Sequence, residues 1–181
     1  AGDRLPIGIG SLPYSHTVHL TLGTVFHEAT AVLESAIASL RDLPLNLVVT
    51  VGPSVDPARF GPQPAHVLIE PYVSHALLLP HCCVVVSQGG AGIMFGALSH
   101  GLPQLVLPQG GDQFMNAEAC QQTGAALSLM PAEVSSHAIA AAVERILIEP
   151  SFTATARAIR TEIDALPDAG MTLDTLTAVA R

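Results

Sequence analysis

The chain has 181 residues, of which 49% are hydrophobic and 12% charged, and its formal net charge is −8. This length suits one domain with a full core and would be cramped for two. Its basic residues are all arginines, scattered along the sequence, which argues against a nucleic-acid partner because nucleic acids need a basic face. Gly, Pro and His interrupt each apolar run before about 18 residues, so no transmembrane helix is expected. The opening AGDRLPIGIG lacks the basic and apolar regions of a signal peptide, which favours a cytoplasmic protein.

The first half of the chain predicts strands joined by helices and loops. Residues 1–16 carry prolines and glycines without periodicity and are predicted to be a linker that precedes a domain over 17–181. The expected elements of this half are a strand over 18–22, a helix over 27–41, strands over 45–51 and 67–72, and a short helix to Leu79 that Ser74 could cap.

The centre of the chain, residues 83–113, contains the most informative motif. A strand over 83–86 is followed by the turn Gly89-Gly90-Ala91-Gly92, a helix over 92–100 and a strand over 104–107. Glycines let a ligand approach the backbone, and the helix points free N–H groups and its positive dipole end at that space, which favours a phosphate. Because no Asp, Glu, Lys or Arg occurs from Pro71 to Gly111, neutral donors must bind it.

The remaining residues complete an α/β pattern. A helix over 114–123, a strand over 125–129, and helices over 135–148, 151–166 and 173–180 are expected. The order predicts a doubly wound, mostly parallel, Rossmann-like sheet of about six strands, with ligands bound at the carboxyl ends of the strands. Thr24, Tyr72, Gln88 and Asp112 follow strand ends, so they can share one crevice.

The three cysteines, Cys82, Cys83 and Cys120, lie on or beside apolar runs, which favours buried free thiols in a reducing compartment. A metal site built from His81, Cys82 and Cys83 is not expected, because neighbouring strand residues face opposite ways.

The glycine-rich turn by itself fits dinucleotide-binding oxidoreductases, nucleotide-sugar enzymes and purely structural turns. Its continuation is more specific: Gly101-Leu102-Pro103, then Pro108-Gln109-Gly110-Gly111-Asp112-Gln113, with Asn116 beyond. Together the two halves resemble the donor-binding signature of bacterial GT-B glycosyltransferases, which decorate antibiotics and other natural products, and the likeness runs from about residue 18 to 176. The resemblance implies the C-terminal, donor-binding half of a GT-B fold. The acceptor domain and its usual histidine base would lie outside this chain, so no catalytic residue is expected here.

The resemblance also implies roles for individual residues. Tyr72 would stack on the nucleobase, Val73 would contact it through the backbone, and His75 would stand beside the ribose. The residues expected to bind the diphosphate are Gly23, Thr24, Gln88, Gly89, Gly90, Ala91, Gly92 and Ile93. Asp112 and Gln113 would bind the sugar. Other interpretations stay open: Tyr72 as an ordinary strand-end residue, and Asp112 with Gln113 as a helix cap.

Several positions depart from the family pattern: Tyr72 stands where a tryptophan is common, Ser74-His75 replaces a usual Pro-Gln pair, and three further positions bear on donor binding. Gln88 stands where a histidine is usual and Ile93 where Thr or Ser is usual, and both usual residues donate to the diphosphate. Losing one neutral hydrogen bond costs about 0.5–1.5 kcal/mol, which weakens donor binding without abolishing it. Gly96 stands where relatives that use UDP-sugars commonly carry a glutamate for the ribose hydroxyls, so a dTDP-linked donor is expected. Gly96 could equally be small for helix packing.

The expected function is therefore donor binding for sugar transfer from a nucleoside-diphosphate sugar to a small natural-product acceptor. Neither a metal nor another cofactor is expected, and neither a nucleic acid nor a membrane is an expected partner, while a homodimer is allowed. Two rivals remain. The spacing of Gly90, Gly92 and Gly96, with Asp112 about 20 residues on, also fits an NAD(P)-dependent oxidoreductase. The changes at Gln88 and Ile93 also fit a catalytically silent partner that activates a true transferase.

Overall fold

Six short segments form a parallel β-sheet in the computed structural model, which describes residues 4–23, 30–167, 170 and 177. The strands are β1 (Thr17–Thr21), β2 (Asn46–Thr50), β3 (Val67–Glu70), β4 (Val84–Ser87), β5 (Gln104–Val106) and β6 (Ala126–Ser128). Their order across the sheet is β3-β2-β1-β4-β5-β6, and every neighbouring pair is parallel. The predicted doubly wound α/β sheet is thereby confirmed.

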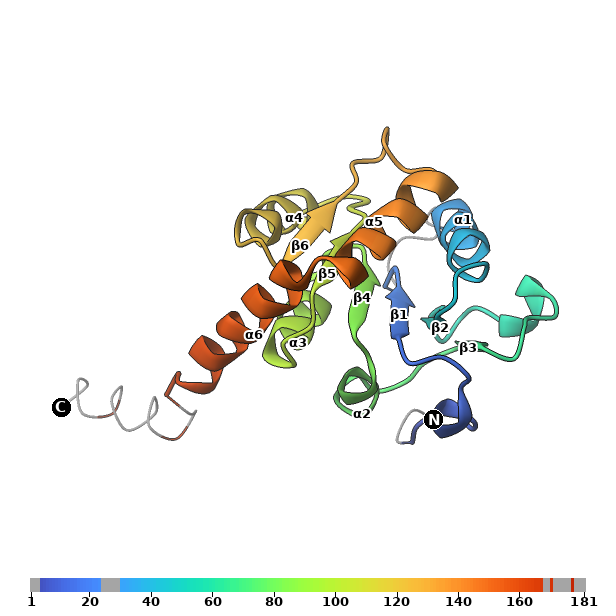
Figure 1. Ribbon diagram of the computed structural model, residues 1–181, viewed down its shortest axis with the longest axis horizontal. Helices are drawn as coiled ribbons and strands as arrows, with labels where there is room; N and C mark the ends of the chain where they lie inside the picture. Colours follow the sequence, from blue (N-terminus) through green and yellow to red (C-terminus); the bar gives the residue numbers. More distant parts are fainter. Residues whose placement is uncertain (1–3, 24–29, 168–169, 171–176, 178–181) are drawn as a thin grey trace.

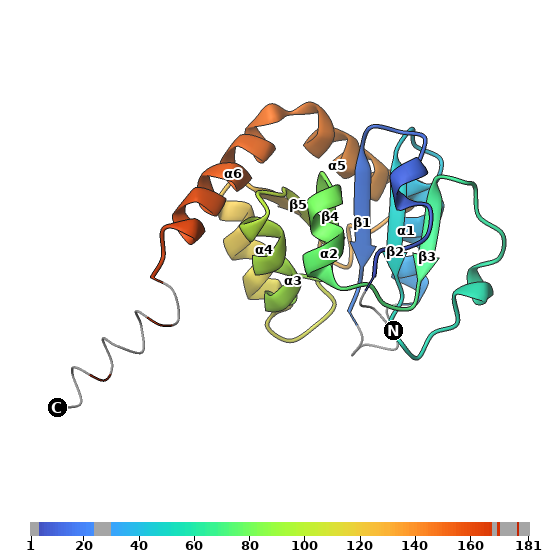
Figure 2. The same cartoon turned by 90° about the horizontal axis from the view of Figure 1, so that it is seen from below.

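Helices cover both faces of this sheet. They are α1 (Thr30–Leu40), α2 (His75–Leu78), α3 (Ala91–Ser99), α4 (Gln113–Gln122), α5 (Ser136–Ile148) and α6 (Pro150–Asp164), with 3-10 turns η1 (Ile9–Ser11), η3 (Pro57–Phe60) and η4 (Leu79–His81). In Figures 1 and 2, α1 and α5 lie on one face, and α2 and α3 lie on the other.

The observed elements fall within a few residues of the predicted ones. The first residues of the predicted helix over 27–41 lie outside the described part of the chain, and of the segment 173–180 only Thr177 is described. Ser74 is the N-cap residue of α2, but its side chain makes no capping hydrogen bond, so the predicted cap is wrong in that respect.

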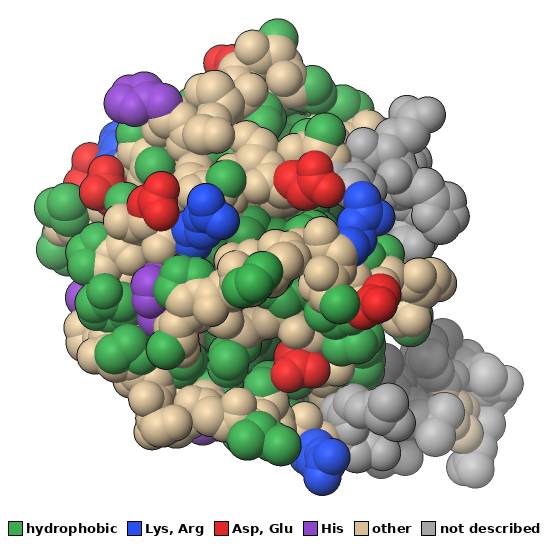
Figure 3. All heavy atoms as spheres, turned by 90° about the vertical axis from the view of Figure 1, so that its right-hand side faces the viewer, with side chains coloured by type: hydrophobic (Ala, Val, Ile, Leu, Met, Phe, Trp, Pro, Cys, Tyr) green, Lys and Arg blue, Asp and Glu red, His purple; other side chains and the backbone are tan. Residues whose placement is uncertain are grey.

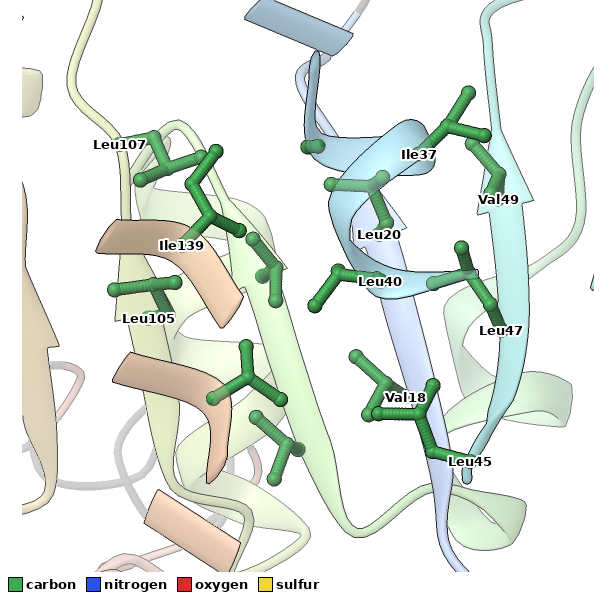
Figure 4. Packing of buried hydrophobic residues seen from close by; sticks show 14 of the residues in the cluster. Val18, Leu20, Ile37, Leu40, Leu45, Leu47, Val49, Leu105, Leu107 and Ile139 are labelled. Atoms are coloured by element: carbon green, nitrogen blue, oxygen red, sulfur yellow. The ribbon is translucent and has the colours of Figure 1, made fainter. Parts of the chain in front are cut away.

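Strand periodicity sorts the core residues onto the two faces. Val18 and Leu20 of β1 point toward α1, where they meet Ile37 and Leu40 (Figure 4). Leu105 and Leu107 meet Ile139 of α5 in the same way. Burying each such side chain stabilises the fold by about 1.5–3 kcal/mol. The alternate residues of β1, His19 and Thr21, consequently face the opposite layer, where α2 and α3 pack.

The segment before β1, predicted to be a linker, contacts the sheet where the structure describes it. Ile9 and Leu12 pack against a buried cluster that includes Val48. The Asn46 side chain accepts from the Tyr14 N–H at 3.0 Å and donates to the Tyr14 carbonyl at 2.7 Å. The linker over 1–16 stays a prediction, but its described part is held against β2.

The surface carries no concentrated positive charge on the face shown in Figure 3, where the basic side chains stand among acidic ones. This is the face that bears α1 and η3. Among the described residues, no helix is long and apolar enough to cross a membrane. All three cysteines are free, but only Cys120 is buried, whereas Cys82 and Cys83 are half-buried. The expectation of three buried thiols was therefore wrong for two of them, because both lie at the margin where β4 begins.

Candidate functional site

A pocket of about 290 Å³ opens at the carboxyl ends of the central strands. Its lining comes from the ends of β1, β2 and β3, the first residue of α2, the turn after β4 and the start of α3: Thr21, Gly23, Thr50, Gly52, Pro71, Tyr72, His75, Gln88, Gly90, Ala91, Gly92 and Ile93. Strands β1 and β4 are neighbours, and the chain leaves them in opposite directions across the sheet. Such a switch point is where open parallel sheets bind their ligands.

Gln88 occupies the space between two glycines of the pocket wall. A Cβ atom on Gly23 would lie only 2.4 Å from Gln88 Nε2, and one on Gly90 would lie 3.0 Å from it. Gly23 also has a φ of +75°, which L side chains rarely adopt. The Gln88 Oε1 atom is buried and has no hydrogen-bond partner. The carboxamide is thus held by packing, and its Nε2, which is not among the buried unpaired atoms, is the polar atom that faces the pocket.

The start of α3 supplies backbone donors. The first intrahelical bond runs from Met94 N–H to the Gly90 carbonyl, so the N–H groups of Ala91, Gly92 and Ile93 have no acceptor within the helix. A Cβ on Gly92 would meet nothing within 4 Å, which leaves the backbone open to a ligand. Free N–H groups and a helix dipole are the features with which helix starts bind anions in general. Diphosphate binding by Ala91, Gly92 and Ile93 stays a prediction.

Gly89 has a different role from the other glycines of the turn. Its φ is +84°, and a Cβ there would lie 2.7 Å from Val106 Cγ1 of β5. Its N–H donates to the Ser87 hydroxyl at 3.2 Å. Gly89 does not line the pocket. It allows the chain to turn against the sheet, and its predicted role in diphosphate binding is at most indirect.

The Ile93 side chain belongs to the core rather than to the polar wall. It is 6% exposed and packs in a cluster with Leu79, Val85, Ala97 and Leu102. Its position in the pocket therefore offers a ligand its backbone N–H and an apolar contact.

Tyr72 and His75 line the end of the pocket near β3. Tyr72 is 51% exposed, so its ring is accessible for stacking. The His75 ring packs edge-on against His19 of β1, with centroids 5.5 Å apart. Burial lowers the pKa of His75. Val73, expected beside the base, has a side chain that is 2% exposed and packs with Val48 and Leu78.

Beneath His75, His19 is a buried neutral imidazole. Its Nδ1 lies 3.0 Å from the Val48 carbonyl and must donate to it, and its Nε2 is buried without a partner. Burial lowers the pKa of His19 to about 4, against the raising effect of the Val48 bond, and His75 lowers it further.

The two residues expected to bind the sugar lie outside this pocket. Asp112 is exposed, makes no capping bond, and accepts from Asn116 Nδ2 at 3.3 Å. Asn116 Nδ2 also donates to the Gly89 carbonyl at 2.9 Å, which ties α4 to the glycine turn. Asp112 therefore does not line the pocket that Tyr72 and Gln88 line, and its contact with the sugar stays a prediction. Asp112 stands beside the glycine turn because Asn116 Nδ2 donates both to the Asp112 carboxylate and to the Gly89 carbonyl.

Gln113 closes the loop before α4. Its Oε1 accepts from the N–H groups of Gln109 at 2.8 Å and Gly110 at 3.2 Å, and the residue is 6% exposed. A structural role is thus evident for Gln113, but the N–H groups that it binds precede α4 and Asp112 makes no capping bond, so the capping interpretation is wrong for both residues. Thr24, the remaining residue expected at the diphosphate, lies outside the described residues.

Sequence reasoning missed four lining residues: Thr21, Thr50, Gly52 and Pro71. The available signal was their position, because each lies at or just after a strand end. Within the described ranges, no group of three or more His, Cys, Asp or Glu side chains could hold a metal ion.

The chain matches known sequences over most of its length. Residues 34–178 match the family described as Erythromycin biosynthesis protein CIII-like, C-terminal domain. Over 155 residues the chain is 35% identical to 4'-demethylrebeccamycin synthase of Lentzea aerocolonigenes, covering 84% of this chain and 36% of that protein. Over 162 residues it is 33% identical to 10-deoxymethynolide desosaminyltransferase of Streptomyces venezuelae, covering 87% and 38%.

Solved structures share the fold. The glycosyltransferase VinC in complex with DTDP superposes with a TM-score of 0.85 at 31% identity, covering 98% of this chain and 44% of that one. The spinosyn rhamnosyltransferase SpnG complexed with thymidine diphosphate gives 0.86 at 28%, covering 97% and 49%. The chain therefore spans less than half the length of these four proteins.

Proposed function

Because this chain belongs to the family of Erythromycin biosynthesis protein CIII-like C-terminal domains, we propose that its pocket binds the nucleoside-diphosphate sugar of a glycosyltransferase. The observation that carries the proposal is the wall formed by Gln88, Gly90 and the start of α3. Three backbone N–H groups without helix acceptors converge there, at the switch point of the sheet. The similarity to 10-deoxymethynolide desosaminyltransferase and to two glycosyltransferase structures in complex with DTDP or thymidine diphosphate supports the same assignment.

In the proposed reaction an acceptor hydroxyl attacks the sugar carbon that bears the diphosphate. The bond from that carbon to the diphosphate oxygen breaks, and the nucleoside diphosphate leaves with the electron pair. The N–H groups of Ala91, Gly92 and Ile93 and the dipole of α3 would stabilise the charge of the leaving group. Since neutral donors and a helix end can carry this charge, we propose that the domain requires neither a metal nor another cofactor.

We also propose that Asp112 and Gln113 orient the sugar, since both stand at the start of α4, which Asn116 ties to the glycine turn. The acceptor is proposed to be a small natural product, as the names of the two relatives indicate for those proteins. Its binding site and the base that deprotonates it would belong to another domain.

The nucleotide is proposed to be thymidine diphosphate. Gly96 has no side chain to accept from a 2′-hydroxyl, and a buried hydroxyl without a partner costs about 1–3 kcal/mol. Close packing is a second reason for glycine there, because a Cβ would lie 3.4 Å from Leu79 Cδ1. The two explanations are distinguished by binding measurements on the Gly96→Glu variant.

Calorimetric titration of the purified chain with dTDP, UDP and NADH tests the proposal. We expect the wild type to bind dTDP more tightly than UDP, and NADH most weakly of the three. In the Gly96→Glu variant the dissociation constants of dTDP and UDP should differ less than in the wild type. Equal or tighter binding of UDP by the wild type would refute the preference for thymidine. Tight NADH binding without a response to either diphosphate would refute nucleotide-sugar binding and favour the oxidoreductase rival.

A second alternative is that the domain belongs to a catalytically silent partner of a true transferase. Two features favour it: the Ile93 side chain is buried, and a glutamine stands at position 88. Introducing Gln88→His and Ile93→Thr together into the full-length protein tests it. If sugar transfer is absent before and after both changes while dTDP still binds, the domain serves a non-catalytic partner.

A further inference from the structure

A row of polar residues ends three neighbouring strands on the pocket side of the sheet. Thr21 of β1 is in register with Thr50 of β2 and with Ser87 of β4. In parallel strands, residues in register share a face, so the three hydroxyl groups lie side by side across the strand ends.

The three hydroxyls differ in what they contact. Ser87 Oγ accepts the N–H of Gly89 and so serves the glycine turn. Thr21 is 6% exposed and Thr50 is 5% exposed, yet both line the pocket. The structure gives neither of these two hydroxyls a hydrogen-bond partner among the residues that it describes. Neither hydroxyl oxygen belongs to the buried side-chain atoms that lack a partner, so both reach the open space of the pocket, where they can donate to and accept from a polar group of a ligand.

The order of the strands indicates which group this is. Tyr72 follows β3, Thr50 ends β2, Thr21 ends β1, and the glycine turn follows β4. Neighbouring strands lie about 4.8 Å apart, so these four positions extend over about 14 Å in that order. A nucleoside diphosphate also has a fixed order: base, pentose, diphosphate. With the base on Tyr72 and the diphosphate at the glycine turn, the pentose falls over the ends of β2 and β1.

We propose that Thr21 and Thr50 form the pentose subsite and hydrogen-bond the 3′-hydroxyl of the bound nucleotide. This inference rests on the proposed function, because it takes the base and diphosphate positions from it. Each threonine hydroxyl can donate one hydrogen bond and accept others, and so can a 3′-hydroxyl, so the pairing is chemically matched. Such a subsite recognises deoxyribose and ribose alike and leaves discrimination at the 2′ position to other residues.

The test compares dTDP with its 3′-deoxy analogue on the wild type and on Thr21→Val and Thr50→Val. Valine keeps the shape of threonine and replaces its hydroxyl by a methyl group, which cannot form a hydrogen bond. In the wild type, loss of the 3′-hydroxyl should weaken binding about two- to tenfold, as expected for a neutral hydrogen bond. In at least one valine variant the two ligands should bind equally. Thr21→Ser and Thr50→Ser keep a hydroxyl, so both should bind dTDP more tightly than its 3′-deoxy analogue, as the wild type does. These two variants also control for misfolding caused by a substitution at either position.

Two controls make the comparison specific. Ser87→Ala lies in the same row but removes a hydroxyl that bonds Gly89, and Thr153→Val lies on α6, outside the pocket. Both should keep the wild-type difference between the ligands. If both valine variants of the pocket keep that difference while dTDP binds, the pentose subsite is refuted and the proposed function stands. If the wild type binds no dTDP, the proposed function is refuted and this inference with it.

Discussion

At the scale of single residues, two glycines of one motif are expected to contribute to different properties. Gly89 is expected to contribute to the stability of the fold, and Gly92 to ligand binding. Gly89 has a left-handed φ and no room for a Cβ, whereas Gly92 is helical and faces open space. Sequence alone makes them equivalent members of one motif. Their backbone angles and neighbours place Gly89 against the sheet and leave Gly92 facing open space beside the pocket.

We therefore expect Gly89→Ala to impair mainly the stability of the fold and Gly92→Ala to impair mainly the binding of dTDP. Gly89→Ala should lower the free energy of unfolding by about 1–3 kcal/mol, because a strained backbone is combined with a clash against Val106. Gly92→Ala should change it by less than about 1 kcal/mol and should weaken dTDP binding instead. Urea denaturation and calorimetry measure the two quantities, and equal loss of stability in both variants would contradict this division.

His19 gives the fold a dependence on pH. Its pKa is about 4 in the folded state and about 6.5 when exposed, so between these values the unfolded chain binds a proton that the folded chain does not. Stability conferred by the neutral imidazole is complete above pH 6.5 and is lost as the pH falls toward 4, by on the order of 2–3 kcal/mol.

The His19→Asn variant should flatten this dependence, because its amide can still donate to the Val48 carbonyl but does not titrate. Denaturation curves from pH 4 to 7 on both proteins provide the measurement. An equally steep loss of stability in the variant would show that other groups cause it.

At the scale of elements, two side-chain amides fix the start of α4, one to the glycine turn and one to the loop that precedes the helix. Asn116 bonds the Gly89 carbonyl, and Gln113 Oε1 holds the loop of Gln109 and Gly110. A helix start that carries the proposed sugar-binding residues is thereby fixed relative to the diphosphate site. This fixation explains how residues outside the pocket can still act on a ligand that extends from it.

Gln113→Ala should lower the free energy of unfolding by about 1–3 kcal/mol, since two N–H groups of the loop lose their acceptor. Asp112→Asn, at the exposed neighbouring position, should change it by less than about 0.5 kcal/mol. Both should weaken binding of a dTDP-sugar more than of dTDP. If neither variant discriminates between these two ligands, the proposed sugar contacts are wrong.

At the scale of the whole molecule, the described sheet has both helix layers and its own core. We expect the 181 residues to fold alone, and dTDP at about a hundred times its dissociation constant to stabilise them by about 2.7 kcal/mol. We expect no sugar transfer by these residues alone, because the resemblance places the acceptor site and the base elsewhere. Thermal denaturation and a transfer assay with added acceptor check the two statements, and detectable transfer would contradict the second.

The sequence by itself determined the order of strands and helices, the parallel sheet, and the glycine turn with its neutral surroundings. These features depend on local periodicity and on the conformational freedom of glycine, both readable along the chain. Only the tertiary structure decided which residues line the pocket. Thr21 and Thr50 entered it and Asp112 did not, because β1 pairs with both β2 and β4 in a fixed register, and pairing between strands distant in sequence leaves no local signal.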